Sequence, residues 1–297
     1  MVEVATIGHV LYDIRCYVDE FPKPDKTSFI QSSIRGGGGG SAANVAASLK
    51  LLGHDSAFIG NVGTDRHGKY LIHDLHRHGV DTRGVNIVSG DTGVSIVLVN
   101  KRAEVEVVQM LGVSEPIKGI DENIIREAKA LHMTSCNVDA LLKAGAVARK
   151  AGLLITFDPG RSISRLGTKR LAQVLKYSDY LIVNRHELAH LTGMNDTVKA
   201  ARKVAKAFDV TCVIKAGKEP VIVEGRSSFT SPPFKVKPVD TIGAGDAFCS
   251  GLLAGMLEGE TLENSVRLAN AVAAAKVMLR GARPHLKREE IEEKFGV

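Results

Sequence analysis

The sequence contains no tryptophan, no closely spaced pair of cysteines and no long apolar run. Without a C-x-x-C pair, its four cysteines argue against a zinc ribbon and against a disulfide framework. No apolar stretch approaches the ~18 residues that a membrane-spanning helix needs, and the polar start is unlike a signal peptide. We therefore expect a cytoplasmic protein with no membrane partner, whose thiols are reduced and mostly buried: Cys16, Cys136, Cys212 and Cys249.

The charge balance is basic but not clustered. The formal net charge is +6 at pH 7, which could attract nucleic acid. However, the Lys and Arg residues are spread along the chain and are not interleaved with exposed aromatic residues. We therefore expect no nucleic acid partner, and phosphorylated small molecules are a simpler explanation of the charge.

The pattern of apolar segments predicts one α/β domain. A chain of 297 residues is long for one domain and short for two large ones. Strand-like runs alternate with helical ones, which predicts a three-layer α/β/α sandwich with a mainly parallel sheet. The predicted strands are residues 4–7, 56–59, 131–133, 153–157, 180–183 and 211–214, and helices are predicted, for example, at 138–151 and 197–208.

Polar or glycine residues end several of these strands, namely Gly8, Asp158, Asn184 and Lys215. The ligand site of an open parallel sheet lies at the carboxyl ends of its strands, so we expect these residues near a ligand. Two segments, about 14–35 and 90–113, break the alternation and instead show a two-residue period. They predict a small β lid apart from the main sheet.

One junction near the C-terminus combines glycines, a helix start and an acid. Residues 240–246, with the sequence D-T-I-G-A-G-D, lead into an apolar segment predicted to be a buried helix. Gly243 and Gly245 let several N–H groups point at one spot, where the positive end of the helix dipole favours an anion. Asp246 lies beside that spot and can take a proton from an attacking hydroxyl. A glycine turn with an acidic helix cap is the alternative, and these residues alone leave both open.

Five consecutive glycines, residues 36–40, precede an Ala-rich segment, 41–53, whose apolar spacing predicts a helix. A flexible linker is one interpretation. Linkers seldom lead into a strongly formed helix inside a compact domain, so a close approach of the backbone to a small ligand is favoured. Asn44, in the first turn of that helix, is placed either to hydrogen-bond a polyol hydroxyl or to cap the helix.

Other motifs are excluded or stay ambiguous. A dinucleotide fingerprint would need a glycine at Ser41, and a P-loop match at 63–69 fails because Tyr70 cannot replace the Mg²⁺-binding hydroxyl. The segment Asn184 to Glu187 is interpreted as a helix capping box or as a Mg²⁺ site that acts through water. Histidines 73, 76 and 78 favour a solvated helix face over a metal site.

Together these motifs resemble the ribokinase-like (PfkB) family of carbohydrate and nucleoside kinases, and the match runs through essentially the whole chain. The matching elements are Asp13, G-G-S-A-A-N at 39–44, G-N-V-G-T-D-R-H-G at 60–68, F-D-P at 157–159, N-R-H-E at 184–187 and D-T-I-G-A-G-D at 240–246. Each element is modest alone, but their order and spacing together are specific.

The resemblance implies transfer of the terminal phosphoryl group of ATP or ADP to a hydroxyl of a small sugar or nucleoside. It implies Asp246 as the general base, with Gly243, Ala244 and Gly245 as the anion hole. The residues implied to bind the acceptor are Asp13, Gly39, Gly40 and Asn44. Those implied to bind the nucleotide are Asn184, Lys215, Gly217, Asn270 and Gly281. Mg²⁺ is implied to bind at Glu187 and Asn184. The resemblance also implies that the lid forms a homodimer interface and that a monovalent cation binds near the 240–246 loop.

The sequence departs from the family pattern at three places. Lys215 and Pro220 replace the outer residues of a T-x-G-x-x-G element, which leaves the donor open. Arg161 follows Asp158-Pro159-Gly160 where many relatives have D-P-N, and Arg35 precedes the glycine run; these arginines either pair with a phosphate on the acceptor or are surface charges. Ile242 replaces a commoner Thr, which alters the monovalent-cation site, although backbone carbonyls could still serve.

Our hypothesis from the sequence is a Mg²⁺-dependent kinase of a ribose-like sugar or nucleoside. Kinases of a phosphorylated pentose such as ribose 1-phosphate, or of a hexose or ketodeoxy-sugar acid, are alternatives, and a catalytically silent sensor is an alternative of a different class. Strand-end positions nominate four residues for the acceptor pocket: His9, Tyr12, Asn137 and Arg161.

Overall fold

The main sheet has nine strands in the order β13-β12-β11-β10-β9-β8-β1-β4-β5. The computed structural model describes residues 2–31, 35–102 and 104–297. The strands of this sheet are β1 (Val4–Ile7), β4 (Ser56–Gly63), β5 (Asp81–Val88), β8 (Ala130–Thr134), β9 (Leu154–Asp158), β10 (Tyr180–Asn184), β11 (Thr211–Lys215), β12 (Val221–Glu224) and β13 (Ser228–Ser231). All neighbours from β11 to β5 are parallel, and β12 and β13 add an antiparallel hairpin. The six predicted strands are therefore confirmed.

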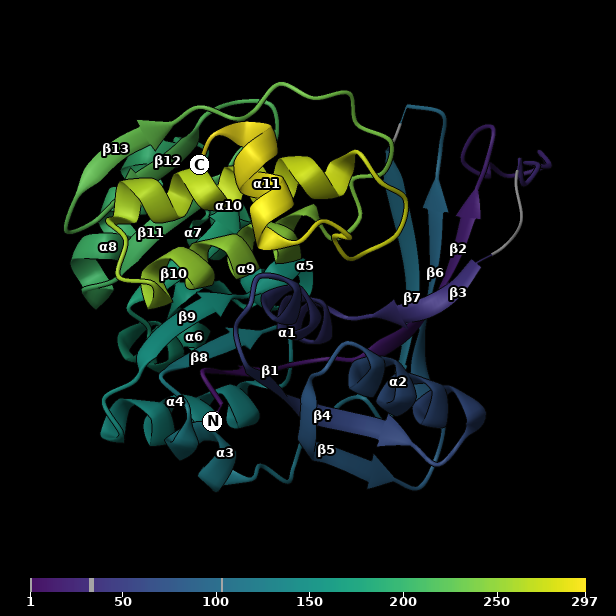
Figure 1. Cartoon of the computed structure of the whole chain (residues 1–297), viewed down its shortest axis with the longest axis horizontal. Helices are drawn as coiled ribbons and strands as arrows, with labels where there is room; N and C mark the ends of the chain where they lie inside the picture. The colour runs from purple at the N-terminus through teal and green to yellow at the C-terminus, as the bar shows by residue number, and fades with distance from the viewer. Residues whose placement is uncertain (1, 32–34, 103) are drawn as a thin grey trace.

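Helices cover both faces of this sheet, which is why its central strands are apolar on both sides. Strands β1 and β8 bury every residue. One face packs against α3 (Glu122–Glu127), α4 (Val138–Lys150), α6 (Gly167–Tyr177), α7 (Arg185–Thr192) and α8 (Thr197–Phe208). The other packs against α1 (Ser41–Leu51), α2 (Arg66–Arg77), α9 (Ala244–Leu257) and α10 (Leu262–Val277), with α11 (Arg288–Phe295) outside α10 (Figure 1). A short α5 (Gly160–Ile163) and a 3₁₀ turn (Ser164–Leu166) follow β9.

A second, four-stranded sheet forms the predicted lid, in the order β3-β2-β6-β7. Its strands are β2 (Leu11–Tyr17), β3 (Arg35–Gly39), β6 (Thr92–Val99) and β7 (Val105–Gly112). In Figure 1 these strands stand on the side toward which the arrowheads of β4 and β5 point, so the lid lies at the carboxyl edge of the main sheet.

The lid strands extend beyond the segments expected from the sequence. Residues 36–39 of the glycine run belong to strand β3, which pairs antiparallel with β2. Glycine fits there because a side chain at most of these positions would overlap a side chain of β2. In the segment predicted at about 14–35, the two-residue period at Phe29, Gln31 and Ser33 was part of the signal. Phe29 and Gln31 belong to no strand, Ile30 forms an isolated bridge with Val18, and Ser33 lies outside the described residues.

Among the described residues, none of the helices has the length and apolar composition that crossing a bilayer would require.

Candidate active site

The amino end of α9 is the centre of the site. Gly243 precedes the helix with a φ of 72°, in the left-handed region, and a side chain there would overlap the carbonyl oxygen of Ala282. Only glycine therefore fits this turn. The loop places Asp246 in the first turn of the helix, as the sequence predicts.

The loop that leads into α9 is held by Asp240, which has no exposed surface. Its carboxylate accepts hydrogen bonds from the N–H of Ile242, the N–H of Gly281 and the hydroxyl of Tyr17, each at 2.9 Å. Its carbonyl oxygen accepts one from Lys276 Nζ at 2.7 Å. Strand β2 of the lid, the end of α10 and the 240–246 loop therefore meet at one buried aspartate. Burial and the hydrogen bond to Asp240 raise the pKa of Tyr17 to about 12, so its hydroxyl is a donor at neutral pH.

Asp246 is positioned by α1. Asn44 Nδ2 donates to Asp246 Oδ2 at 2.7 Å, and Asn44 Oδ1 accepts from Arg283 Nε at 3.2 Å. Because Arg283 can only donate, it fixes which end of the amide faces Asp246. Arg283 is itself held by Asp74 of α2, at 2.5 Å from Nη1. Burial raises the pKa of Asp246 above its usual range, and the bond from Asn44 opposes that rise.

Asp13, on the inner face of β2, is only 5% exposed. Burial raises its pKa to about 6, with Arg15, 3.9 Å away, acting in the opposite direction. The charge of Asp246 also raises this pKa, which places the two carboxylates within electrostatic reach of each other. Strand β3 makes room for this pair, because a side chain at Gly39 would overlap the Asp13 carboxyl and one at Gly37 would overlap the Arg15 guanidinium.

Replacing Gly39 by alanine is therefore expected to displace the Asp13 carboxylate while the lid still folds. We expect the KM of the acceptor to rise about tenfold, the cost of one hydrogen bond to a charged group, and the free energy of unfolding to fall by less than ~3 kcal/mol. Steady-state kinetics and urea unfolding measure the two effects. Gly119→Ala is the matched control, since the nearest atoms there belong to the side chain of Asn86 at 3.3 Å or more. An unchanged acceptor KM in Gly39→Ala would contradict the role given to Asp13.

A second cluster of charges lies where β9 and β11 end. Lys215 Nζ is 2.5 Å from Asp158 Oδ2, and the thiol of Cys249 donates to the same oxygen at 3.5 Å. Burial by itself would raise the pKa of Asp158, but the Lys215 ammonium holds it below its usual range. A side-chain carbon at Gly245 would be 3.2 Å from Lys215 Nζ, so this ammonium lies beside the first turn of α9.

Glu187 completes this cluster from α7. Asn184 and Glu187 form the predicted capping box, with Asn184 N–H donating to Glu187 Oε2 and Glu187 N–H to Asn184 Oδ1. Burial, and then the charge of Asp158, raise the pKa of Glu187. Glu187, Asp158 and Asp246 thus each interact electrostatically with the Lys215 ammonium. Carboxylate oxygens with a net negative charge suit a Mg²⁺ ion that is held through its water shell.

Three residues predicted for the acceptor pocket make contacts of their own. Tyr12 alternates with Asp13 along β2, so it faces α2 and stacks on His67 with ring centroids 4.3 Å apart. Asn137 holds the backbone of Ile117, and His9 Nε2 lies 3.0 Å from Glu115 Oε2.

Among the residues that the family resemblance assigns to the nucleotide, the Asn270 amide donates to Ser231 and to the carbonyl of Pro232. Gly217 turns the chain between β11 and β12 with a φ of 61°. Gly281 donates its N–H to Asp240, and Arg161 is exposed but lies within electrostatic reach of Glu187.

Sequence reasoning missed Arg283, Asp74, Lys276 and Cys249. Asn44 and Arg283 are 239 positions apart, and no local pattern pairs them. Lys276 stands in an otherwise apolar helical stretch, and that single charge was the signal that could have found it.

A model of the pfkB family of carbohydrate kinases matches residues 1–288. The chain belongs to this family. A relative 40% identical over 288 residues, covering 95% of this chain and 94% of its own length, is the "ATP-dependent ribose-1-phosphate kinase" of Halopiger xanaduensis. The "Nucleoside kinase" of Methanothermobacter thermautotrophicus is 26% identical and covers 92% of this chain. The crystal structure of ribokinase from Thermotoga maritima superposes with a TM-score of 0.85 at 26% identity over the whole of both chains.

Membership in the pfkB family confirms the predicted fold class and the kinase activity. The protein is a phosphotransferase, and proteins named as sugar, nucleoside and ribose-1-phosphate kinases are similar to it in sequence. The hypothesis of a sugar or nucleoside kinase therefore holds, and the alternative of a phosphorylated pentose matches the name of the 40% identical relative.

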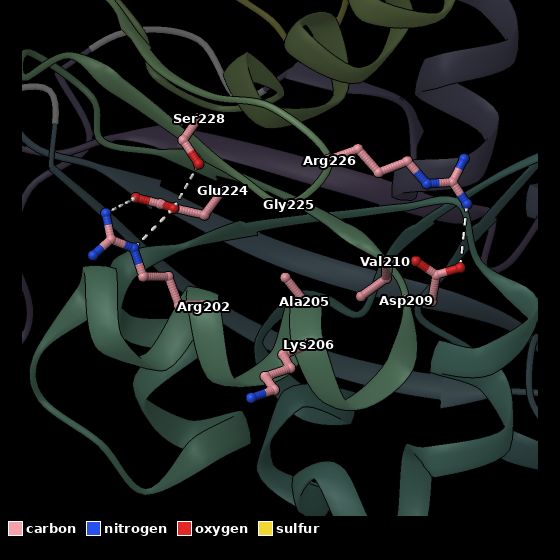
Figure 2. A pocket seen from close by; sticks show the side chains of 9 residues that line it. All are labelled: Arg202, Ala205, Lys206, Asp209, Val210, Glu224, Gly225, Arg226 and Ser228. Carbon is pink, nitrogen blue, oxygen red and sulfur yellow. Dashed lines mark hydrogen bonds and ion pairs between the residues drawn. The ribbon is translucent and has the colours of Figure 1, made fainter.

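The hollow shown in Figure 2, about 450 Å³, is separate from the active site of this pfkB kinase. It lies beside the C-terminal half of α8 and the amino end of β11, whereas the candidate catalytic residues lie toward the carboxyl ends of the strands. Two of its arginines pair with acids in its own wall: Arg202 with Glu224, and Arg226 with Asp209. We therefore assign it no part in phosphoryl transfer.

Proposed function

We propose that this protein transfers the terminal phosphoryl group of ATP to the 5-hydroxyl of a pentose that carries a substituent at C1, with ribose 1-phosphate as the principal acceptor. The observation that carries the proposal is a pair of carboxylates, the half-buried Asp246 of α9 and the buried Asp13 of lid strand β2, which lie within electrostatic reach of each other. Asp246 faces the reacting hydroxyl, and Asp13 binds a ring hydroxyl. The 40% identical relative, named as an ATP-dependent ribose-1-phosphate kinase, supports both the donor and the acceptor.

Arg15 favours an acceptor that already carries a phosphate. Its side chain is largely buried beside Asp13, and Gly37 leaves room for its guanidinium. Guanidinium groups bind phosphate through paired hydrogen bonds. Arg161, the candidate from sequence, instead interacts electrostatically with Glu187 and so lies on the nucleotide side. The one primary hydroxyl of ribose 1-phosphate is at C5, which makes it the hydroxyl presented to Asp246.

The residues of the site divide the chemistry between them. Asp246 accepts the proton of the attacking hydroxyl, and its raised pKa makes it a better base than an exposed carboxylate. The N–H groups of residues 243–246 and the ammonium of Lys215 stabilise the charge on the transferring phosphoryl group. Tyr17 ties the lid to Asp240, and the closed lid excludes water that would compete as an acceptor.

Glu187, with Asp158 nearby, would hold a hydrated Mg²⁺ ion, and Asn184 shapes this site through the capping box. When bound, Mg²⁺ neutralises charge on the donor phosphates. Gly217, Gly281 and Asn270 would line the nucleotide site, as the family resemblance implies.

A panel of acceptors and donors tests this function. Ribose 1-phosphate, ribose, adenosine, fructose and 2-keto-3-deoxygluconate are compared with ATP and with ADP, in the presence of Mg²⁺. The proposal expects the highest kcat/KM for ATP with ribose 1-phosphate, and nucleosides next because they also carry a C1 substituent and a free 5-hydroxyl. Preference for fructose or for 2-keto-3-deoxygluconate would overturn the choice of acceptor. Preference for ADP would overturn the choice of donor.

We also propose that two copies of the chain associate through the outer faces of their lids, in the cytoplasm. Ile96, Val108 and Met110 lie on one face of the lid sheet, with β6 and β7 paired so that Ile96 is opposite Val108. Their exposures are 44%, 67% and 52%, which is high for neighbouring apolar side chains. A second copy would cover this face. The four buried, unpaired cysteines are compatible with a reducing compartment.

The substitution Val108→Asp tests the dimer. A charge placed in a closely packed apolar interface costs several kcal/mol, so we expect sedimentation velocity to show a dimer for the wild type and a monomer for the variant at micromolar concentration. Leu166→Asp is the control, since Leu166 is 45% exposed but belongs to the turn after α5 and not to the lid. A wild type that sediments as a monomer would contradict the proposal.

A further inference from the structure

Lys276, in the last turn of α10, has no exposed surface at all. Burying an ammonium is costly unless hydrogen bonds and an opposite charge replace its water. Lys276 Nζ donates to the carbonyl of Asp240 at 2.7 Å and to the carbonyl of Leu279 at 3.4 Å, and it lies 3.8 Å from Asp240 Oδ1. The side chain is thus surrounded as a bound cation would be, by two carbonyl oxygens and a carboxylate.

The ammonium stands where the catalytic loop begins. The loop residue Asp240 leads within three residues to Gly243, the N-cap of α9. The backbone N–H groups of Val239 and Asp240 both donate to the carbonyl of Val277, one residue beyond Lys276. Lys276 therefore fastens the end of α10 to the loop that carries the anion hole.

The resemblance drawn from the sequence implies a monovalent cation near this loop, held by backbone carbonyls. The described residues do not suit one, because the Asp240 carbonyl already accepts a hydrogen bond from an ammonium of this chain. A second cation next to Lys276 would meet its positive charge, and Arg15 adds another positive charge within electrostatic reach. The opposing negative charges are those of Asp240 and Asp246.

We propose that Lys276 is an internal monovalent cation: its ammonium holds the Asp240 carbonyl and carboxylate in place, and the kinase needs no added K⁺, Na⁺ or NH₄⁺. Lys276 acts as a positioning residue, since it touches the loop and not the reacting atoms. The inference rests on the proposed function, because it assumes that the loop leading into α9 is the site of phosphoryl transfer.

The first experiment removes the ammonium and offers a replacement. In a buffer whose only monovalent cation is tetramethylammonium, the wild type is expected to be fully active. Adding K⁺ or NH₄⁺ to 100 mM is expected to change its kcat by less than about twofold. Lys276→Ala is expected to lose about 10- to 100-fold in kcat, as for a lost hydrogen bond to a charged group, and to recover at least about tenfold with K⁺ or NH₄⁺. Lys276→Met fills the space without a charge and should be slow and not rescued.

The second experiment needs no substrate. Thermal unfolding of Lys276→Ala is followed in tetramethylammonium and then with added K⁺ or NH₄⁺. The added ion should raise the Tm of this variant, because an ion bound only to the folded state stabilises it. The wild type and Lys276→Met should show no such rise. Lys206→Ala, an exposed lysine of α8, controls for general salt effects.

These outcomes separate the two proposals. A wild type that is stabilised or activated several-fold by K⁺ overturns the internal-cation proposal, even if Lys276→Ala does not fold. Full activity of Lys276→Ala without added cation also overturns it. A wild type that phosphorylates no acceptor, but whose Lys276→Ala variant shows the ion-specific rise in Tm, would leave the cation site standing and overturn the proposed function instead.

Discussion

Asp246→Asn is expected to lower kcat by about 10²- to 10⁴-fold, the usual contribution of a positioned general base. Asparagine keeps an oxygen that can accept the hydrogen bond from Asn44, so the shape of the site is preserved while the base is lost. Because burial raises the pKa of Asp246, the carboxylate is destabilising in the folded protein at neutral pH, and the variant should unfold at the same Tm or a higher one.

The measurement is kcat with saturating ATP and acceptor, together with the Kd of ATP from calorimetry. The Kd should change little, since the substitution removes an interaction made in the transition state. Asp196→Asn, which alters the exposed N-cap of α8, is the control. A variant that retains more than a tenth of the wild-type kcat would show that another group takes the proton.

Lys215→Met is expected to have the second large effect, on both stability and activity. Methionine has nearly the same length but leaves Asp158 buried without its partner. Breaking a buried ion pair on one side typically lowers the free energy of unfolding by about 3–5 kcal/mol. The loss should grow as the pH rises, because at low pH the unpaired Asp158 can take up a proton and become neutral. Phosphoryl transfer should fall with it, since Lys215 lies beside the first turn of α9.

The double variant Asp158→Asn/Lys215→Met separates these two effects. It removes both charges, so most of the lost stability should return, whereas transfer should stay low. Urea unfolding at pH 8 and the kinase assay measure the two quantities. If the double variant recovered activity as well as stability, the Lys215 ammonium would have a structural role alone.

The parallel sheet and its ligand edge could be predicted from the sequence because each signal is local. A parallel strand buried on both faces is mostly apolar, and β1 and β8 bury every residue. The residues that follow such strands must lie at one edge of the sheet. The capping box of Asn184 and Glu187 also depends only on residues three positions apart. Both could therefore be predicted without any knowledge of the tertiary structure.

The support of the site could not be predicted in the same way. Arg283 orients Asn44 across 239 positions, and Lys276 reaches Asp240 across 36. Such pairs depend on how α1, α9 and α10 pack together, which no short pattern encodes. Tyr12 illustrates a different failure: it was nominated by its position near a strand end, but the two-residue period of β2 turns it away from Asp13 and toward His67.

The glycine run shows how a sequence pattern can suggest a function without revealing the local structure. From the sequence we predicted a close approach of the backbone to a small ligand. In the structure these glycines form strand β3, and side chains at 37, 38 and 39 would overlap or crowd Arg15, Asp74 with Arg283, and Asp13, respectively. The glycines are therefore needed to seat the charged groups of the site, a requirement visible only when those groups are in place.

The most direct test of the account is ³¹P NMR of the wild-type protein with ATP, Mg²⁺ and ribose 1-phosphate. The account predicts ADP and a pentose with a second phosphate on C5, formed in equal amounts, and no such product with Asp246→Asn. Release of inorganic phosphate without a phosphorylated pentose, or a product from Asp246→Asn at the wild-type rate, would contradict it.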